Sequence, residues 1–83
     1  MAEELVKLLS EEQFDFICEE FDLTDVMLSD LSDDDVEDVY EGLADIEVEE
    51  TMKADEENKD LSERGRIASE IVTLWGNVFA EED

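Results

Sequence analysis

Apolar residues recur every three or four positions along three stretches of this chain, which is the spacing of one face of an α-helix. In residues 11–21 the apolar face consists of Phe14, Ile17, Cys18 and Phe21. In residues 33–50 it consists of Val36, Val39 or Tyr40, Leu43 and Ile46. In residues 61–80 it consists of Ile67, Ile71, Leu74 and Val78, with Ala68, Val72, Trp75 and Phe79 beside them.

No segment alternates between apolar and polar residues at the period of a β-strand, and the chain has no proline. We therefore predict an all-α fold, a small three- or four-helix bundle with an acidic surface. Residues 1–83 are expected to form a single helical domain. The expected helices span about 2–9, 11–21, 33–50 and 61–80.

The third stretch carries the widest apolar stripe. Glu70 is the only charged residue between Ile67 and Ala80. A stripe of this width predicts a helix that is packed on two sides, so we expect it to be the hub of the core. The Gly76-Asn77 pair could end or kink it.

Each main helix is preceded by a side chain that can cap it, and in two cases a Gln or Glu three residues later completes a capping box. The predicted caps are Ser10 with Gln13, Ser32, and Asp60 with Glu63; Ser62 is also best explained as a cap. The connector 22–31 is expected to hold a short helical turn capped by Thr24 or Asp25. Residues 53–59 are either a loop or a frayed continuation of the preceding helix.

The charge is the most unusual property of the chain. With 29 acidic and 5 basic residues the formal net charge is −24, whereas a magnitude of roughly 2–8 keeps a small domain in solution. Eighteen of the acids and none of the bases lie between Leu8 and Met52. Such a surface repels nucleic acid and anionic membranes, so a basic protein surface is the expected partner.

Residues suited to catalysis are scarce. The chain has no histidine, and its one cysteine, Cys18, lies among apolar neighbours and is best explained as a core residue. Residues 22–35 supply oxygen ligands but lack the central glycine of a calcium loop. Ser32 is followed by Asp33 rather than by the leucine of an acyl-carrier motif. We expect a protein that is not an enzyme, with no catalytic residue, no metal and no cofactor.

The acidic stretch itself is the candidate site. Ten carboxylates between Asp33 and Glu50 on a helix about 27 Å long give about one negative charge per 2.7 Å, against about one per 1.7 Å of axis in duplex DNA. The candidate partner-binding residues are Asp33, Asp34, Asp35, Glu37, Asp38, Glu41 and Asp45, extended by Glu11, Glu12, Asp15 and Glu19.

In size, charge and the acidic stretch from Glu11 to Glu50, the chain resembles the small acidic DNA-mimic proteins of phages and mobile elements, which include many anti-CRISPR proteins. The resemblance is to a class without a common motif or fold, so it assigns no residue roles. It implies an inhibitor that binds a basic nucleic-acid-binding protein, such as a CRISPR effector nuclease or a restriction enzyme.

A second interpretation places the working surface on the apolar C-terminal helix. The protein would then be an interaction adaptor or a homodimer that uses Trp75, Phe79, Val72 and Met52, with Trp75 as an anchor instead of a core residue. The acidic face would only be solvated. The acidic start of the chain lacks the basic region of a signal peptide, and no apolar run approaches the roughly 20 residues of a membrane span. We therefore expect a cytoplasmic protein.

Overall fold

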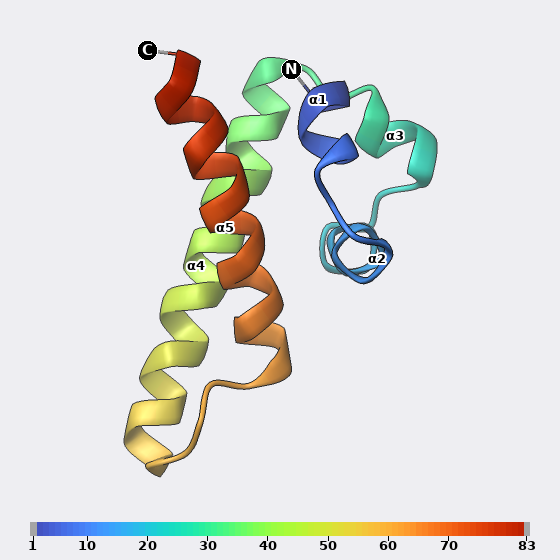
Figure 1. Cartoon of the computed structure of the whole chain (residues 1–83). Helices are drawn as coiled ribbons and strands as arrows, with labels where there is room; N and C mark the ends of the chain where they lie inside the picture. Colours follow the sequence, from blue (N-terminus) through green and yellow to red (C-terminus); the bar gives the residue numbers. More distant parts are fainter. Residues whose placement is uncertain (1, 83) are drawn as a thin grey trace.

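The computed structural model describes residues 2–82 as five helices, with no strand among these residues. They are α1 (Ala2–Lys7), α2 (Glu11–Glu20), α3 (Asp25–Ser29), α4 (Asp33–Glu57) and α5 (Glu63–Glu82). The two long helices α4 and α5 lie side by side and antiparallel, and α1, α2 and α3 gather beside one end of this pair (Figure 1). The prediction of an all-α fold, a small helical bundle, is confirmed. The fifth helix is α3, which is the short helical turn expected within the connector 22–31.

The core is formed where α5 and α4 face each other and where the short helices close over them. Its buried side chains come from all five helices: Leu5, Ile17, Leu28, Val36, Val39, Leu43, Ile46, Ile67, Ala68, Ile71 and Trp75. Trp75 is only 1% exposed, so the prediction that places it in the core is correct. Burial of each large apolar side chain contributes about 1.5–3 kcal/mol.

Capping side chains begin α2, α3 and α4 as the sequence indicates. The Ser10–Gln13 capping box is complete: Gln13 N–H donates to Ser10 Oγ at 3.2 Å, and Ser10 N–H donates to Gln13 Oε1 at 3.0 Å. Ser32 Oγ accepts from Asp35 N–H and Thr24 Oγ1 accepts from Met27 N–H, each at 3.2 Å. These side chains satisfy amides that the first turn of a helix leaves without partners.

Two caps were predicted just before α5, Asp60 and Ser62, and the structure uses Ser62. Ser62, rather than Asp60, accepts a hydrogen bond from Gly65 N–H at 3.1 Å. The Ser62 hydroxyl also donates to Glu50 Oε2 at 3.2 Å. Helix α5 begins at Glu63, two residues after the start that an Asp60 cap would give, so Ser62 is the residue directly before the helix.

Helix α4 continues to Glu57, beyond residue 50, where the prediction placed its end. Residues 51–57 contain no proline or glycine, so the interpretation of 53–59 as a continuation of the helix is the better one. The helix ends at Asn58, which adopts the left-handed conformation (φ 55°, ψ 44°). Lys59 N–H then donates to Ala54 O at 2.9 Å, the closing bond of a Schellman motif. Helix α5 runs through Gly76 without ending.

Two glycines allow close approaches between helices. A Cβ at Gly42 would lie 2.6 Å from Phe21 Cε1, so the glycine lets the end of α2 rest directly on α4. A Cβ at Gly65 would lie 2.7 Å from Glu50 Cβ, at the crossing of α4 and α5. Carbon atoms normally stay about 3.5–4.0 Å apart, so both contacts depend on the missing side chain.

Candidate partner-binding surface

All eleven candidate residues are exposed in the structure. Seven of them lie on the N-terminal half of α4 and are called here the acidic ridge: Asp33, Asp34, Asp35, Glu37, Asp38, Glu41 and Asp45. Its crest follows the helical repeat through Asp34, Asp38, Glu41 and Asp45, on the side of α4 that is opposite to the buried Val36, Val39, Leu43 and Ile46. One side of the helix therefore builds the core, and the other presents carboxylates.

The basic residues of the chain are all used in ion pairs away from the ridge. Lys7 pairs with Glu3, Lys53 with Glu49 and Lys59 with Glu57, at 3.3–3.8 Å. Arg64 and Arg66 of α5 pair with glutamates of α2, α4 and α5. Among residues 2–82, no ion pair involves an acidic-ridge residue, so the ridge presents its negative charge without internal compensation.

Arg64 joins α5 to both of its neighbours. Its Nε and Nη2 donate to the two oxygens of Glu20 at 2.9 and 3.0 Å, and its Nη1 donates to Glu50 Oε1 at 2.9 Å. These hydrogen bonds lower the pKa of both carboxyls below the ordinary value and raise the pKa of Arg64. Glu50 is 9% exposed. Both glutamates are therefore structural groups and do not belong to the candidate surface.

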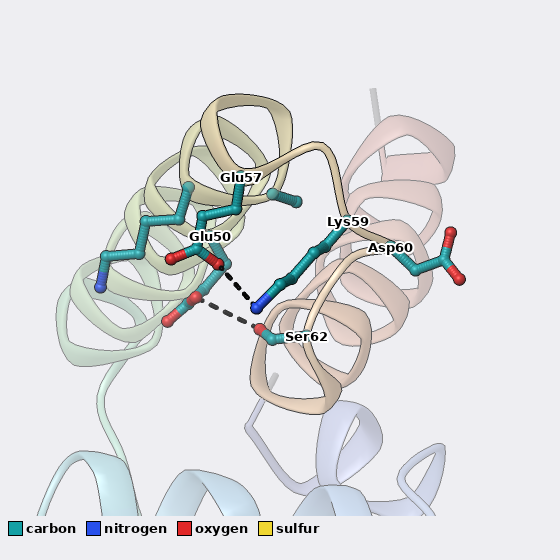
Figure 2. Close-up of a pocket in the computed structure, with 7 residues that line it drawn as sticks. Glu50, Glu57, Lys59, Asp60 and Ser62 are labelled. Carbon is teal, nitrogen blue, oxygen red and sulfur yellow. Dashed lines mark hydrogen bonds and ion pairs between the residues drawn. The ribbon is translucent and has the colours of Figure 1, made fainter.

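A pocket of about 260 Å³ lies beside Glu50 at the end of the α4–α5 pair. Lys59 and Ser62 point across it toward Glu57 and Glu50, whereas Asp60 points away (Figure 2). Its charged groups are thus largely engaged with one another. This pocket is better explained as the packing of the α4–α5 loop than as a binding site.

The four candidate residues of α2 differ in whether they pair with a basic residue. Glu12 accepts a hydrogen bond from Arg66 at 3.1 Å, which turns it toward α5. Glu11, Asp15 and Glu19 follow one another at four-residue spacing on the outer side of α2, and among residues 2–82 they form no ion pair. None of the four lines either of the hollows beside the ridge described next.

One flank of the ridge borders an apolar groove, called here the α2–α4 groove. It has a volume of about 330 Å³ and is lined by Phe21, Leu23, Met27, Leu31, Asp35, Asp38 and Val39. Met27 belongs to α3, and Asp35, Asp38 and Val39 belong to the start of α4. Phe21, Leu23 and Leu31 lie in the short segments that join α2 to α3 and α3 to α4. Sequence reasoning missed this groove, although the apolar residues of the connector 22–31 were a signal for it.

The opposite flank carries a second hollow of about 320 Å³, lined by Glu37, Glu41, Tyr40 and Phe79. The rings of Tyr40 and Phe79 meet edge to face, with centroids 5.1 Å apart and an interplanar angle of 82°. The ridge is thus a band of carboxylates with apolar surface on both sides. Further along α4 the outward stripe becomes apolar at Val48 and at Met52, which is 61% exposed.

Other kinds of site find little support. Among residues 2–82, no group of three or more Cys, Asp or Glu side chains is arranged to hold a metal ion. Burial raises the pKa of the Cys18 thiol, and the nearby Asp25 and Asp15 carboxylates raise it further, so the thiol is a poor nucleophile at neutral pH. Within the same residues no helix is long and apolar enough to cross a membrane.

Comparison of the chain with protein-family models, with curated proteins and with solved structures gave no match. The class that fold and surface define is a small, strongly acidic helical bundle. The role of the protein is therefore inferred from its acidic and apolar surface alone.

Proposed function

We propose that the protein binds the basic, nucleic-acid-binding surface of a partner protein and inhibits it, with the acidic ridge occupying the place of DNA or RNA phosphates. The proposal rests on one observation. Every Lys and Arg is engaged with a glutamate outside the ridge, and the seven ridge carboxylates are exposed without a basic partner among residues 2–82.

The spacing of these charges supports mimicry of a phosphate backbone. Residues 33–45 span about 20 Å of helix, so the ridge presents about one carboxylate per 2.8 Å on a rigid rod. Duplex DNA presents about one phosphate per 1.7 Å of its axis. Glu11, Asp15 and Glu19 on α2 add further acidic surface. A groove lined with Lys and Arg would be attracted to this array and would then exclude nucleic acid.

Many weak contacts would supply the binding energy. A single exposed ion pair contributes about 0–1 kcal/mol, so affinity must come from the sum over the ridge. Because salt screens exposed charges, the affinity should fall steeply as ionic strength rises. The protein would act in the cytoplasm by stoichiometric binding and without catalysis, on a target such as a CRISPR effector nuclease or a restriction enzyme.

A pair of charge-matched variants tests this proposal. The ridge variant carries Asp34→Asn, Asp38→Asn, Glu41→Gln and Asp45→Asn. The control variant neutralises the same number of exposed acids elsewhere: Asp55→Asn, Glu56→Gln, Asp60→Asn and Glu81→Gln. Both have the same net charge and nearly unchanged side-chain shapes. Each tagged protein is used to capture partners from host lysate, with elution by a salt gradient and by duplex DNA.

The wild type and the control variant should retain the same nucleic-acid-binding protein, and DNA should displace it. The ridge variant should release that protein at much lower salt. Equal retention by the ridge variant would refute the proposal. A retained protein that DNA does not displace would refute it as well.

A further inference from the structure

We propose that the α2–α4 groove receives an apolar side chain that the partner carries next to Lys or Arg residues. This inference rests on the proposed function and makes it more specific. The groove would decide which basic surfaces bind, because a band of carboxylates alone attracts all of them.

The groove has an apolar interior and an acidic border. Phe21, Leu23, Leu31 and Val39 are partly or fully buried against the core and form its walls. Met27, which is 50% exposed, stands at its opening. Asp35 and Asp38 of the acidic ridge form the border on the α4 side. A volume of about 330 Å³ lies at the small end of the range of roughly 300–1,000 Å³ for ligand pockets, which suits an anchoring side chain.

Helix α3, beside the groove, has apolar side chains exposed to solvent. Helix α3 buries Leu28 in the core but turns Val26, which is 77% exposed, and Met27 outward. Met27 is unbranched and polarisable, and such side chains adapt well to the surface of a partner. Of these two exposed apolar residues of α3, Met27 lines the groove and Val26 does not.

Charge complementarity selects the occupant. The groove is bordered by two carboxylates, and the whole segment from Leu8 to Met52 contains no basic residue. Nucleic acid and anionic lipid would be repelled from it. A second copy of the chain would bring its own net charge of −24 against the same surface. A protein segment that combines Lys or Arg with an apolar anchor satisfies both the interior and the border.

The two parts of such a contact differ in their response to salt. Ion pairs along the ridge weaken as salt screens them, whereas apolar burial in the groove does not depend on charge. Loss of the anchor should therefore lower affinity at every salt concentration and leave the slope of log affinity against log salt unchanged. Loss of ridge carboxylates should reduce that slope.

Two synthetic peptides serve as probes: an amphipathic peptide of lysine and leucine, and a peptide of equal length and charge in which serine replaces leucine. Affinity for the fluorescently labelled peptides is measured by anisotropy from about 50 to 300 mM salt. The groove variant is Met27→Gln, which removes the apolar end of an exposed side chain and should not prevent folding. The matched control is Met52→Gln, the same change at an exposed position outside the groove.

The wild type should bind the leucine peptide about tenfold more tightly than the serine peptide, as expected for burial of one anchoring side chain. Met27→Gln should lose most of this preference without a change in salt slope, and Met52→Gln should keep it. Equal loss in both variants, or no loss in Met27→Gln, would overturn the assignment of the groove. A dimer in sedimentation experiments that Met27→Gln dissociates would overturn the choice of occupant.

These results separate the two proposals. If both peptides bind equally, with a salt slope that the ridge variant reduces, the groove inference fails and the proposed function stands. If neither peptide binds in a salt-dependent way, the ridge is not a site for basic partners and both proposals fail.

Discussion

Replacement of Gly65 by alanine tests the crossing of α4 and α5. An added Cβ would lie 2.7 Å from Glu50 Cβ and 2.8 Å from Leu61 Cδ1. The Glu50 Cβ is fixed to the backbone of a long helix, so it cannot rotate away. Alanine gains up to about 1 kcal/mol of helix propensity over glycine, and overpacking costs about 1–3 kcal/mol. We therefore expect Gly65→Ala to destabilise the protein by up to about 2 kcal/mol.

Urea unfolding followed by far-UV circular dichroism measures this change, with an unchanged m-value as evidence that the unfolded and folded states are otherwise the same. The midpoint of thermal unfolding should fall by up to about 15 °C for a domain of this size. Gly76→Ala is the matched control in the same helix, because its Cβ would meet only the end of the Tyr40 side chain, at 3.1 Å from Oη. It should be neutral or stabilising. If Gly65→Ala stabilised the protein as much as Gly76→Ala, the close crossing would be wrong.

Three further outcomes follow from the core and the charges. Arg64 holds the pKa of Glu50 below its ordinary value of 4.5, so this carboxylate stabilises the fold above that pH and ceases to do so as the pH falls through its lowered folded pKa. The difference in unfolding free energy between wild type and Glu50→Gln should therefore be greatest near neutral pH and shrink as the pH falls below 4.5; a difference that grew toward acid would contradict this. Added salt should raise the melting temperature of the wild type, since it screens the repulsion among 29 acids, and the ridge variant should gain less; scanning calorimetry in a salt series checks both. Ile71→Ala should cost about 2–5 kcal/mol in urea unfolding because the side chain is fully buried, and a cost near zero would place Ile71 outside the core.

The sequence predicted those features that depend on neighbouring residues. Helix positions follow from apolar spacing, and the capping box of Ser10 with Gln13 is a contact across three residues. The cap of Ser62 on Gly65 is also a contact across three residues, whereas the hydrogen bond from Ser62 to Glu50 joins two helices and was not predictable in this way. The end of α4 was misplaced because nothing before Asn58 breaks the helix, and Asn58 acts through its left-handed conformation.

The candidate surface was predictable in part. Exposure of the ridge follows from its position opposite the apolar face of α4. The pairing of Glu12 with Arg66 and of Glu20 with Arg64 joins residues far apart in sequence, so composition could not show which acids are neutralised. The α2–α4 groove brings together side chains from α3, from α4 and from the segments on either side of α3, and only their packing creates it. That the ridge binds a partner stays a prediction.

The antiparallel pairing of α4 and α5 has a consequence for the order in which the molecule assembles. These helices are consecutive in sequence and joined by the short segment 58–62, so closing the hairpin costs little chain entropy and can occur early. Helices α1, α2 and α3 must then dock onto it across a greater distance along the chain. The ridge belongs to the hairpin, but the groove needs the docked helices. Backbone amides of α1, α2 and α3 should therefore exchange hydrogen faster than those of the α4–α5 hairpin. When these three helices open, the groove is lost and the acidic ridge remains.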